Sequence, residues 1–541
     1  MEIALESDMP TYSGGLGVLA GDTVRSSADL NVPLVAVSLV SRKGYFKQKL
    51  NQNGDQVEFP SDWEPSKFTE ELPVRATVKI EGRDVQVRAF HYSVSSPKGG
   101  VVPVLLLDTD IETNLPHDRA ITDYLYGGDL EYRLKQEVIL GVGGVRILDT
   151  LGFRIRRYHM NEGHSALLAL ELLRKNQFDA QRVKEMCIFT THTPVEAAFD
   201  KFDYPMVNRI LGDLVPSETV RQYGGVDRLN MTLLALNLSD YINGVSKRYG
   251  EYSKSLFPGY KVHAITNGVH SYTWTCAHFR RLYDKYLPGW ADEPSLLTRV
   301  GIIPDEQILE AHREAKEDLL TCVKTMTGVV MDPRVLTVGL ARRATGYKRL
   351  DFIFSDVERL RKIARRWGLQ IIFAGKSHPK DETGKMIIRR IFQLINGLKD
   401  DIKMVYLENY DLALSKLVVS GVDVWLNTPL PPMEASGTSG MKAAHNGVLN
   451  FSVLDGWWVE GWIEGITGWS IGPHPHENIT PEERKPQEIE DLYNKLNYVI
   501  SPTYYDRVDS WAMMMQNTIS ILASYFNSHR MMHRYVTDAY L

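Results

Sequence analysis

The chain of 541 residues contains only three cysteines, Cys187, Cys276 and Cys322, which lie far apart. Thiols this sparse fit neither a disulfide framework nor a metal-ligand motif, so we expect reduced thiols and no metal site. The opening MEIALESDMP has acidic residues where a secretory signal carries a basic segment and an apolar run. No uninterrupted apolar run approaches about 18 residues, so we expect no membrane-spanning helix and a cytoplasmic location.

The sequence also lacks an excess of one charge. Its 62 basic and 67 acidic residues give a formal net charge of −5 and are scattered without long runs of one sign. This balance offers no electrostatic footprint for a nucleic acid or an anionic membrane, so neither is an expected partner. An anionic substrate would therefore need a local basic site.

The length exceeds the limit of about 250–300 residues for one hydrophobic core, so we expect two large domains. Short apolar runs alternate with helical patterns, which is typical of parallel α/β units. Strands are predicted at 2–5, 33–39, 101–107, 154–159, 187–191, 335–340, 369–374, 403–407 and 422–426, and helices at 16–29, 132–151, 165–176 and 229–238.

We place the domain boundary near residues 266–270, which gives an N-terminal domain 1–266 and a C-terminal domain 267–541. The stretch after Pro502 reads as a long helix that could return to the first domain. The expected fold is α/β, with two Rossmann-like domains facing a central cleft. Strand ends and helix N-termini around such a cleft favour an enzyme that acts on a phosphate or a sugar.

The most informative segment is EASGTSGMKAAHNG, which runs from Glu434 to Gly447. A turn rich in Gly, Ser and Thr that opens a helix exposes several backbone N–H groups and so suits a phosphate. An enclosed lysine close by, Lys442, could bind an aldehyde cofactor covalently. From composition alone, a helix-entry turn with a solvated lysine and a surface carboxylate would be the commoner explanation of the segment.

The same run, flanked by NTPLPPM and VLNFSVLDGWW, resembles the cofactor segment of the glycogen and maltodextrin phosphorylase family. The resemblance implies that Lys442 holds pyridoxal 5′-phosphate and that Glu434 acts on the glucosyl unit as a catalytic residue. It also implies a substrate contact and three cofactor contacts in the turn between them, namely Ser436 for the substrate and Gly437, Thr438 and Ser439 for the cofactor.

A basic cluster, Ala341-Arg-Arg-Ala-Thr-Gly-Tyr-Lys-Arg349, follows the predicted strand at 335–340. Arginine offers an anion bidentate hydrogen bonds, and lysine offers a point charge. A solvated basic face is the structural alternative, but ligands bind at the carboxyl ends of strands in open α/β sheets. The cluster resembles the family's Arg-x-x-x-Tyr-Lys signature, which implies that Arg343 binds the substrate phosphate, Lys348 supplies a second catalytic cation and Tyr347 contacts the cofactor.

The glycine-rich turn TYSGGLGVLAGD, at residues 11–22, opens another predicted helix. A helix N-terminus attracts an anion. The pattern G-x-G-x-x-A also fits a loose dinucleotide fingerprint, and a purely structural tight turn would explain it as well. The turn resembles the phosphorylase Gly-Gly-Leu-Gly loop, which implies that the N–H groups of Gly14, Gly15 and Leu16 meet the substrate phosphate.

Histidines follow two predicted strands, in Asn161-Glu-Gly-His-Ser165 and in Thr191-His-Thr-Pro-Val-Glu196. A histidine at a strand end is often a hydrogen-bonded structural residue. Both turns resemble phosphorylase turns, which implies that His192 bonds the glucosyl ring and acts in catalysis, with His164 as a neighbouring substrate contact. Glu162 and Gly163 replace the family's Asp-Thr, so no contact is carried over to them.

Two further turns complete the resemblance. Thr266-Asn267-Gly268 reads alone as an ordinary turn but is similar to a family turn whose Asn bonds sugar hydroxyls, which implies Asn267 as a substrate contact. Glu408-Asn409-Tyr410 resembles another family turn and implies that Tyr410 contacts the cofactor. The longer members' N-terminal extension has no counterpart, so the chain resembles the short bacterial and archaeal branch or a fragment of a longer protein.

The resemblance implies a glycosyltransferase architecture and a retaining phosphorolysis of α-1,4-glucan to glucose 1-phosphate. The cofactor phosphate would exchange a proton with the substrate phosphate. The partners would be the glucan and inorganic phosphate, and a homo-oligomer stays open. Three alternatives remain: a synthase that uses a nucleotide sugar, a glycosidase that pairs two of Glu162, Glu196 and Glu434, and a glucan-binding protein without activity.

Overall fold

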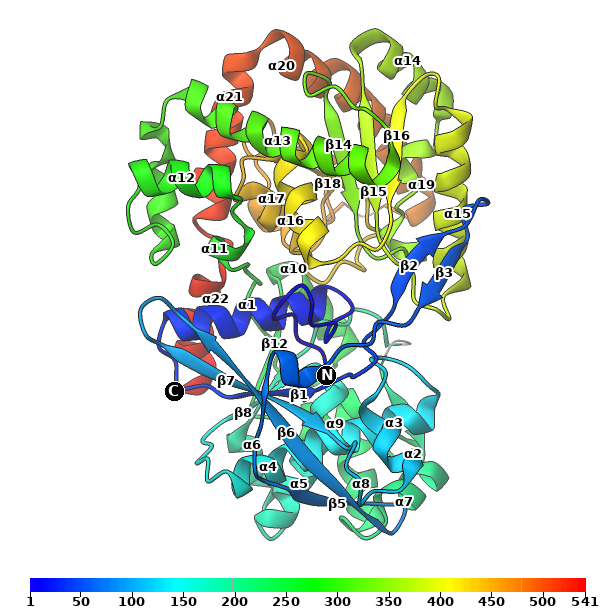
Figure 1. Ribbon diagram of the computed structural model, residues 1–541, viewed down its shortest axis with the longest axis vertical. Helices are drawn as coiled ribbons and strands as arrows, with labels where there is room; N and C mark the ends of the chain where they lie inside the picture. The colour runs from blue at the N-terminus through cyan, green and yellow to red at the C-terminus, as the bar shows by residue number, and fades with distance from the viewer. Residues whose placement is uncertain (197–198, 478) are drawn as a thin grey trace. The chain divides into compact units, whose positions relative to one another are not determined.

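The computed structural model describes residues 1–196, 199–477 and 479–541. The chain forms two compact units (Figure 1). The first unit comprises Met1–Phe46, Pro60–Thr266 and Met532–Leu541, and the second comprises Lys47–Phe59 and Asn267–Met531. Both units combine helices with parallel strands, which confirms the predicted α/β class.

The first unit contains two larger sheets. One is parallel in the order β13–β12–β9–β8, with bounds His263–Ala264, Tyr241–Gly244, Cys187–Thr190 and Tyr158–Asn161. In the other, β1 (Ala36–Leu39) pairs in parallel with β7 (Val101–Asp108), and β6 (Arg83–Ser95) pairs antiparallel with β7, β4 (Glu70–Glu71) and β5 (Ala76–Ile80). A small antiparallel pair joins β10 (Lys201–Asp203) to β11 (Arg228–Asn230).

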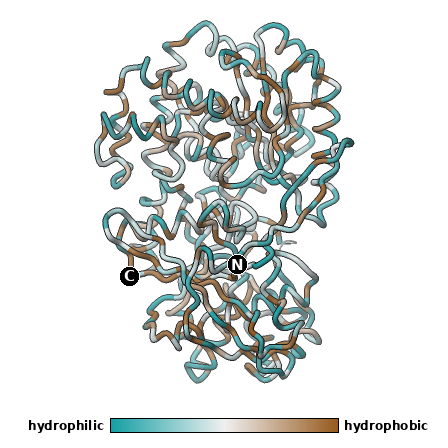
Figure 2. Tube along the Cα trace, in the orientation of Figure 1, coloured by the Kyte–Doolittle hydropathy of each residue, from teal (hydrophilic) through white to brown (hydrophobic). Residues whose placement is uncertain are grey.

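Ten α-helices accompany these sheets in the first unit, among the described residues. They are α1 Gly15–Asp29, α2 Pro116–Arg119, α3 Leu130–Val138, α4 Gly144–Thr150, α5 Leu167–Lys175, α6 Ala180–Met186, α7 Tyr204–Leu211, α8 Ser217–Gly224, α9 Met231–Asn237 and α10 Lys247–Leu256. Figure 2 shows hydrophobic residues concentrated along the strands, where the core of the unit is buried. Burial of this apolar surface is the main favourable contribution to folding.

The second unit is built on a parallel sheet in the order β16–β15–β14–β17–β18–β19. The bounds are Lys403–Leu407, Gln370–Ala374, Thr337–Ala341, Val424–Asn427, Leu449–Val453 and Gly468–Ile471. Chain order along this sheet reverses between β14 and β17, so the turns that follow these two strands lie at a topological switch point. Ligands of open α/β sheets bind in the crevice at such a point.

Helices and one hairpin accompany this sheet, and the last of the helices, α22, begins in this unit and ends in the first. The helices are α11 Ser271–Trp274, α12 Ala277–Tyr286, α13 Asp305–Thr327, α14 Val357–Trp367, α15 Glu382–Gly397, α16 Leu412–Gly421, α17 Ser439–Ala444, α18 Trp458–Gly461, α19 Pro481–Lys495, α20 Ser501–Asp506, α21 Val508–Asn517 and α22 Ser528–Tyr535. Helices α13 and α16 pack against each other and against the sheet (Figure 1). The antiparallel hairpin of β2 (Lys47–Leu50) and β3 (Gln56–Phe59) belongs to this unit, although its neighbours in sequence belong to the first.

Three sequence predictions differ from the structure. Residues 2–5 form no strand, because Ile3 and Ala4 donate their N–H groups to the carbonyls of Thr11 and Gly17 in a loop. The predicted helix 132–151 contains a π-helical turn at Ile139–Gly143. The long helix expected after Pro502 is divided into α20, α21 and α22, and its last ten residues, Met532–Leu541, belong to the first unit.

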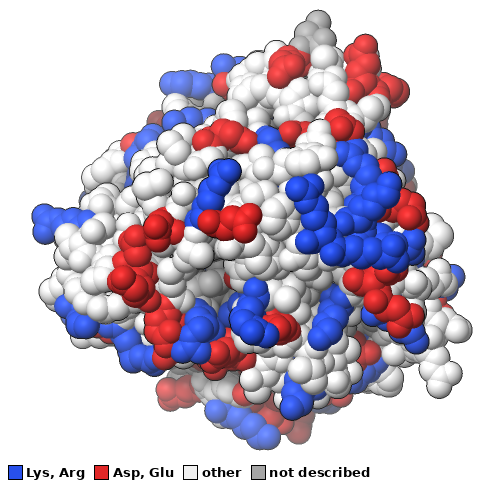
Figure 3. Space-filling model, turned by 90° about the horizontal axis from the view of Figure 1, so that it is seen from above, with Lys and Arg blue, Asp and Glu red and all other residues white. Residues whose placement is uncertain are grey.

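The surface charges are paired locally. Figure 3 shows Lys and Arg side chains interspersed with Asp and Glu on one face. On α14, for example, Arg361 and Arg365 both pair with Asp401, at 2.7 and 2.6 Å. Within the described residues, every helix is too short or too polar to cross a membrane.

Candidate active site

The turn that follows β14 brings two cations to one carboxylate. Arg342 Nη2 donates to Glu434 Oε2 at 2.5 Å, and Lys348 Nζ lies 2.7 and 2.6 Å from the two oxygens of Glu434. Glu434 is buried and the two cations are largely buried, and the exposed fractions of the three side chains are 11 to 14%. Arg343, the neighbour predicted to bind phosphate, is instead exposed. The switch point therefore holds a cationic cluster built from Arg342, Lys348 and Glu434.

The electrostatics of this cluster favour an additional anion. Burial alone would raise the pKa of Glu434, but the charges of Lys348 and Arg342 outweigh burial and hold that pKa below its usual range. The carboxylate is therefore ionised, and one positive charge of the cluster remains unbalanced. Arg342 Nε and Nη1 are buried and have no hydrogen-bond partner among the described residues. Guanidinium N–H groups form strong, charge-assisted hydrogen bonds to a phosphate.

Lys442 lies in an enclosed position on α17. Lys442 is 8% exposed, and its Nζ lies 4.0 Å from the ring centroid of Trp274. The side-chain amide of Asn446 donates to the carbonyl oxygens of Trp274 and Lys442, at 2.8 and 3.0 Å. These bonds tie α17 to α11 around the lysine. The enclosure expected for Lys442 is thus present, with its amine beside an aromatic ring.

The residues between Glu434 and Lys442 form a tight turn. Gly437 has a φ of +79°, which favours glycine, and a Cβ atom on Gly440 would lie 2.2 Å from Asn450 Oδ1. Ser439 Oγ accepts a hydrogen bond from Trp425 Nε1 at 3.0 Å, and the Ser436 carbonyl accepts one from the N–H of Trp457 at 2.9 Å. Thr438 is the N-cap residue of α17 and makes no side-chain capping bond.

The remaining residues predicted to contact the cofactor lie on turns of the same unit. Lys348 Nζ lies 4.8 Å from the ring centroid of Tyr347. Tyr410 follows β16, in a turn held by the β2–β3 hairpin. There the Gln48 N–H donates to Asn409 Oδ1 at 3.2 Å, and the Asn409 N–H donates to Gln48 Oε1 at 3.0 Å. Nothing in the sequence near Gln48 indicates that this hairpin reaches the turn.

An aldehyde cofactor that carries a phosphate requires an amine and anion donors. Lys442 supplies the amine, and the unpartnered Nε and Nη1 of Arg342 supply buried donors for an anion. Both belong to the second unit. The donor set therefore fits such a cofactor.

In the glycine loop of the first unit, residues 14–17, the first two glycines have open space around them and the last is tightly packed. A Cβ atom on Gly14 or Gly15 would meet no described atom within 4 Å, whereas one on Gly17 would lie 2.7 Å from Tyr12 Cβ. Glu2 Oε2 already accepts the N–H of Gly14 at 3.2 Å. The N–H groups of Gly15 and Leu16 lie in the first turn of α1, where a helix offers them no acceptor. They are the donors best placed for an anion.

The His192 turn is held by the residues that end β8. His192 Nε2 lies 2.5 Å from Asn161 Oδ1, and Glu162 Oε2 accepts from the His192 N–H and the Thr193 hydroxyl, both at 2.8 Å. Glu162 adopts a φ of +71°, which turns the chain back toward His192. Burial lowers the pKa of His192 to about 3, so the ring is neutral. Burial also raises the pKa of Glu162, which is bonded only to neutral donors.

Two predicted sugar contacts carry unpartnered polar atoms. His164 Nδ1 and Asn267 Oδ1 are both buried without a hydrogen-bond partner among the described residues. Burial and nearby cations lower the pKa of His164 well below its usual value, so this ring is also neutral. Buried polar atoms of native proteins are usually satisfied, so these two atoms suit a ligand with hydroxyl groups.

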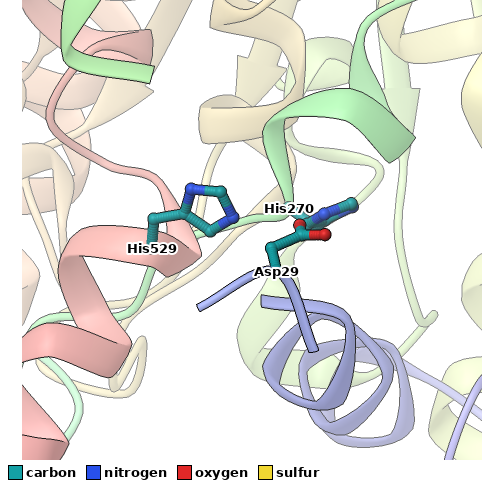
Figure 4. A group of neighbouring side chains, drawn as sticks. All are labelled: Asp29, His270 and His529. Atoms are coloured by element: carbon teal, nitrogen blue, oxygen red, sulfur yellow. The ribbon is translucent and has the colours of Figure 1, made fainter. Parts of the chain in front are cut away.

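Two other histidines of the second unit, His270 and His529, lie edge to face with ring centroids 6.0 Å apart (Figure 4). His270 Nδ1 accepts the N–H of Thr273 and thereby caps α11. This bond gives His270 a structural role.

Arg342 and Glu162 are site residues for which the sequence predicted no phosphorylase role. The pair Arg342-Arg343 was visible directly after a strand, and only the turn conformation decides which of the two points inward. Glu162 replaces a family aspartate, so the resemblance implies no contact for it. Its place at the end of a strand, beside the His192 turn, was the available signal.

The profile of the carbohydrate phosphorylase family matches residues 217–465. The maltodextrin phosphorylase of Thermococcus litoralis is 39% identical to this chain, over all of the chain and 70% of its own length. The glycogen phosphorylase of Aquifex aeolicus is 36% identical, over all of this chain and 85% of its own length. An uncharacterized protein of Methanocaldococcus jannaschii is 30% identical over all of this chain and 98% of its own length.

Proposed function

This chain belongs to the carbohydrate phosphorylase family, and on that premise we propose that it cleaves α-1,4-glucan ends with inorganic phosphate to release glucose 1-phosphate. The observation that carries the proposal is the cluster of Arg342, Lys348 and Glu434, which has one unbalanced positive charge and two unpartnered guanidinium donors. A phosphate is the ligand that such a site suits. We also propose a cytoplasmic location for the reaction.

We propose that Lys442 holds pyridoxal 5′-phosphate, with Gly437, Thr438 and Ser439 beside it and with Tyr347 and Tyr410 as further contacts. The enclosure of Lys442 against Trp274 supports this assignment. When bound, the cofactor supplies a phosphate whose second pKa, near about 6, suits proton exchange close to neutrality. Ser436 belongs to the substrate side of the same turn.

The chain's own cations hold the anions together. Glu434 fixes the positions of Lys348 and Arg342, so that neither cation has to reorganise when a phosphate arrives. Arg343, on the same turn, remains our candidate for the substrate phosphate. In the glycine loop, the N–H groups of Gly15 and Leu16 add neutral donors that a helix N-terminus directs at an anion, whereas the Gly14 N–H is already accepted by Glu2.

Uncharged side chains would bind the glucosyl unit. His192, together with His164 and Asn267, would bond hydroxyls of the glucosyl unit. The peptide carbonyl of His192 would face the positive charge that develops on the sugar as its bond to the glucan breaks. We keep the two-domain glycosyltransferase architecture, in which both domains serve one substrate, as part of this proposal.

The glycosidase alternative receives less support. Glu196 is exposed and pairs with Lys201 at 2.8 Å, and Glu162 is occupied by hydrogen bonds to the His192 turn. Neither carboxylate is placed as a free nucleophile. A synthase that uses a nucleotide sugar would have no need for the enclosed amine of Lys442.

The reverse reaction tests the proposed function. Purified enzyme supplied with maltodextrin and glucose 1-phosphate should lengthen the glucan and release inorganic phosphate in equal amounts. A nucleotide sugar offered in place of glucose 1-phosphate should give no elongation. Elongation only with the nucleotide sugar would overturn the proposal in favour of a synthase.

A further inference from the structure

The ring of His192 has one nitrogen engaged inside the protein. Strands β8 and β9 pair in parallel, with Asn161 opposite Thr190, so the residues after the two strands leave the sheet side by side. Asn161 Oδ1 lies 2.5 Å from His192 Nε2. The contact thus joins the last residue of one strand to the turn that follows the other.

The backbone around this ring is fixed from both sides. Glu162 accepts hydrogen bonds from the His192 N–H and the Thr193 hydroxyl, both at 2.8 Å, and the Tyr249 hydroxyl donates to the Thr193 carbonyl at 2.7 Å. The turn therefore has little freedom to rotate the ring away from Asn161. Rotation of the His192 side chain would break its hydrogen bond to Asn161.

The strand beneath Asn161 is also held by a buried polar network. His159 Nε2 lies 2.7 Å from Thr190 Oγ1, which in turn donates to Asn243 Oδ1 at 2.8 Å. The hydroxyls of Tyr535 and Tyr540 complete this network, through Asn243 Nδ2 at 3.1 Å and His159 Nδ1 at 2.8 Å. The C-terminal residues thus brace the strands that position His192.

The charge state of the ring follows from its surroundings. An amide oxygen can only accept a hydrogen bond, so His192 Nε2 must carry the proton that it shares with Asn161. Burial lowers the pKa of His192 to about 3 and that of neighbouring His159 to about 4, so both rings are neutral. In a neutral ring with its proton on Nε2, Nδ1 keeps a free lone pair.

We propose that Asn161 is a positioning residue that fixes the tautomer of His192, so that Nδ1 accepts a hydrogen bond from a hydroxyl of the glucosyl unit. The inference rests on the function proposed above, because it names the sugar as the donor. Because Nδ1 of His192 is then an acceptor, the site favours a substrate with a hydroxyl at this position over one with only a hydrogen-bond acceptor there.

Nitrogen NMR of the histidine rings tests the tautomer without any need for activity. In protein labelled with ¹⁵N only at histidine, the His192 signals are identified by their loss in His192→Gln. We expect wild-type His192 to carry its proton on Nε2 at neutral pH, and Asn161→Leu to shift the signals toward the other tautomer or a mixture. A wild-type ring with its proton on Nδ1 would overturn the proposal.

Kinetics with two substitutions at Asn161 separate positioning from a general loss of structure. Asn161→Leu should lower kcat/KM for the glucan about tenfold at every pH, since a hydrogen bond to the substrate is lost. Asn161→Asp keeps an acceptor but adds a charge that raises the pKa of His192. The charged ring has no acceptor, so this variant should be impaired at low pH and recover as pH rises above the new pKa.

The groups that face His192 are Asn161, Glu162, His159 and His164, and neither substitution changes the last three. Asn208→Asp, at an exposed position of α7, is the matched control and should leave the pH profile unchanged. Unchanged kcat/KM in Asn161→Leu, or the same pH profile in both Asn161 variants, would overturn the positioning role. A wild-type enzyme with the expected tautomer but no phosphorolysis would instead overturn the proposed function.

Discussion

Glu162 and Glu434 are both buried carboxylates, with exposed fractions of 6 and 9%, yet their surroundings shift their pKa values in opposite directions. Glu434 bonds two cations, whose charges outweigh burial and lower its pKa. Glu162 bonds only backbone N–H groups and a hydroxyl, so burial raises its pKa. A carboxylate at a strand end can therefore balance charge or organise a neutral turn, and its partners decide which.

The same contrast extends to the two candidate regions. The switch point of the second unit is cationic and has unpartnered donors, which suits phosphate. The strand ends of the first unit present neutral histidine rings, which suit sugar hydroxyls. The predictions below test whether these two chemistries are as separate as the structure indicates.

The largest effect is expected from Lys442→Ala, which removes the amine proposed to hold the cofactor. The variant should fold but lose all phosphorolysis and the absorbance of bound pyridoxal phosphate. Borohydride treatment of the wild-type protein, followed by peptide mapping, should tag Lys442. Lys485→Ala, at an exposed position of α19, is the control. A tag on a different lysine would show that the assignment is wrong.

The second prediction compares Glu434→Gln with Glu162→Gln in pH-dependent unfolding. Glu434 has a lowered folded pKa, so its stabilisation is present above the unfolded pKa and is lost as pH falls through the folded pKa. Glu434→Gln leaves the two cations without their carboxylate. We therefore expect the free energy of unfolding to fall by about 3 kcal/mol at pH 7 and to depend less on pH in the acidic range.

The contribution of Glu162 to stability should depend on pH in the opposite direction. Its folded pKa is raised, so the wild-type protein loses stability from Glu162 as pH rises from the unfolded pKa through the folded pKa. Glu162→Gln removes this dependence and keeps one amide oxygen as an acceptor. Equal pH dependence of unfolding in the two variants, measured by urea titration from pH 4 to 8, would contradict the comparison.

The third prediction separates the two adjacent arginines. Both Arg342→Ala and Arg343→Ala should lower kcat/KM for phosphate at least about tenfold, since hydrogen bonds to charged groups are worth roughly 1.5–3 kcal/mol. Only Arg342→Ala should also lower Tm, because Arg342 pairs with buried Glu434 whereas Arg343 is exposed. If Arg343→Ala leaves phosphate saturation kinetics unchanged, Arg343 is a surface residue and Arg342 alone serves the anion.

The smallest effect on stability is expected at the glycine loop. Gly15→Ala places its methyl group in open space and should leave stability unchanged or raise it by about 0.5–1 kcal/mol. It should still weaken phosphate use, through a blocked backbone approach that added guanidinium does not relieve. Gly17→Ala should instead lower Tm, because its Cβ would lie 2.7 Å from Tyr12 Cβ. Normal phosphate kinetics in Gly15→Ala would remove the loop from the proposed site.

Much of the fold could be predicted from the apolar runs. The strands expected at 369–374 and 403–407 match β15 and β16 within one residue. The sequence did not reveal the β2–β3 hairpin contact, because Gln48 bonds residues more than 300 positions away. Nor could it show that Arg342 rather than Arg343 reaches Glu434, since that depends on the turn after β14. Local patterns predict elements, whereas partners that are distant in sequence decide what a side chain does.

The central claim is that phosphate, not water, accepts the glucosyl unit. Purified enzyme incubated with maltodextrin, with and without inorganic phosphate, tests it directly when glucose 1-phosphate and free glucose are both measured. We predict that glucose 1-phosphate forms only when phosphate is present and that free glucose stays at background. Free glucose released at the same rate with and without phosphate would contradict the account.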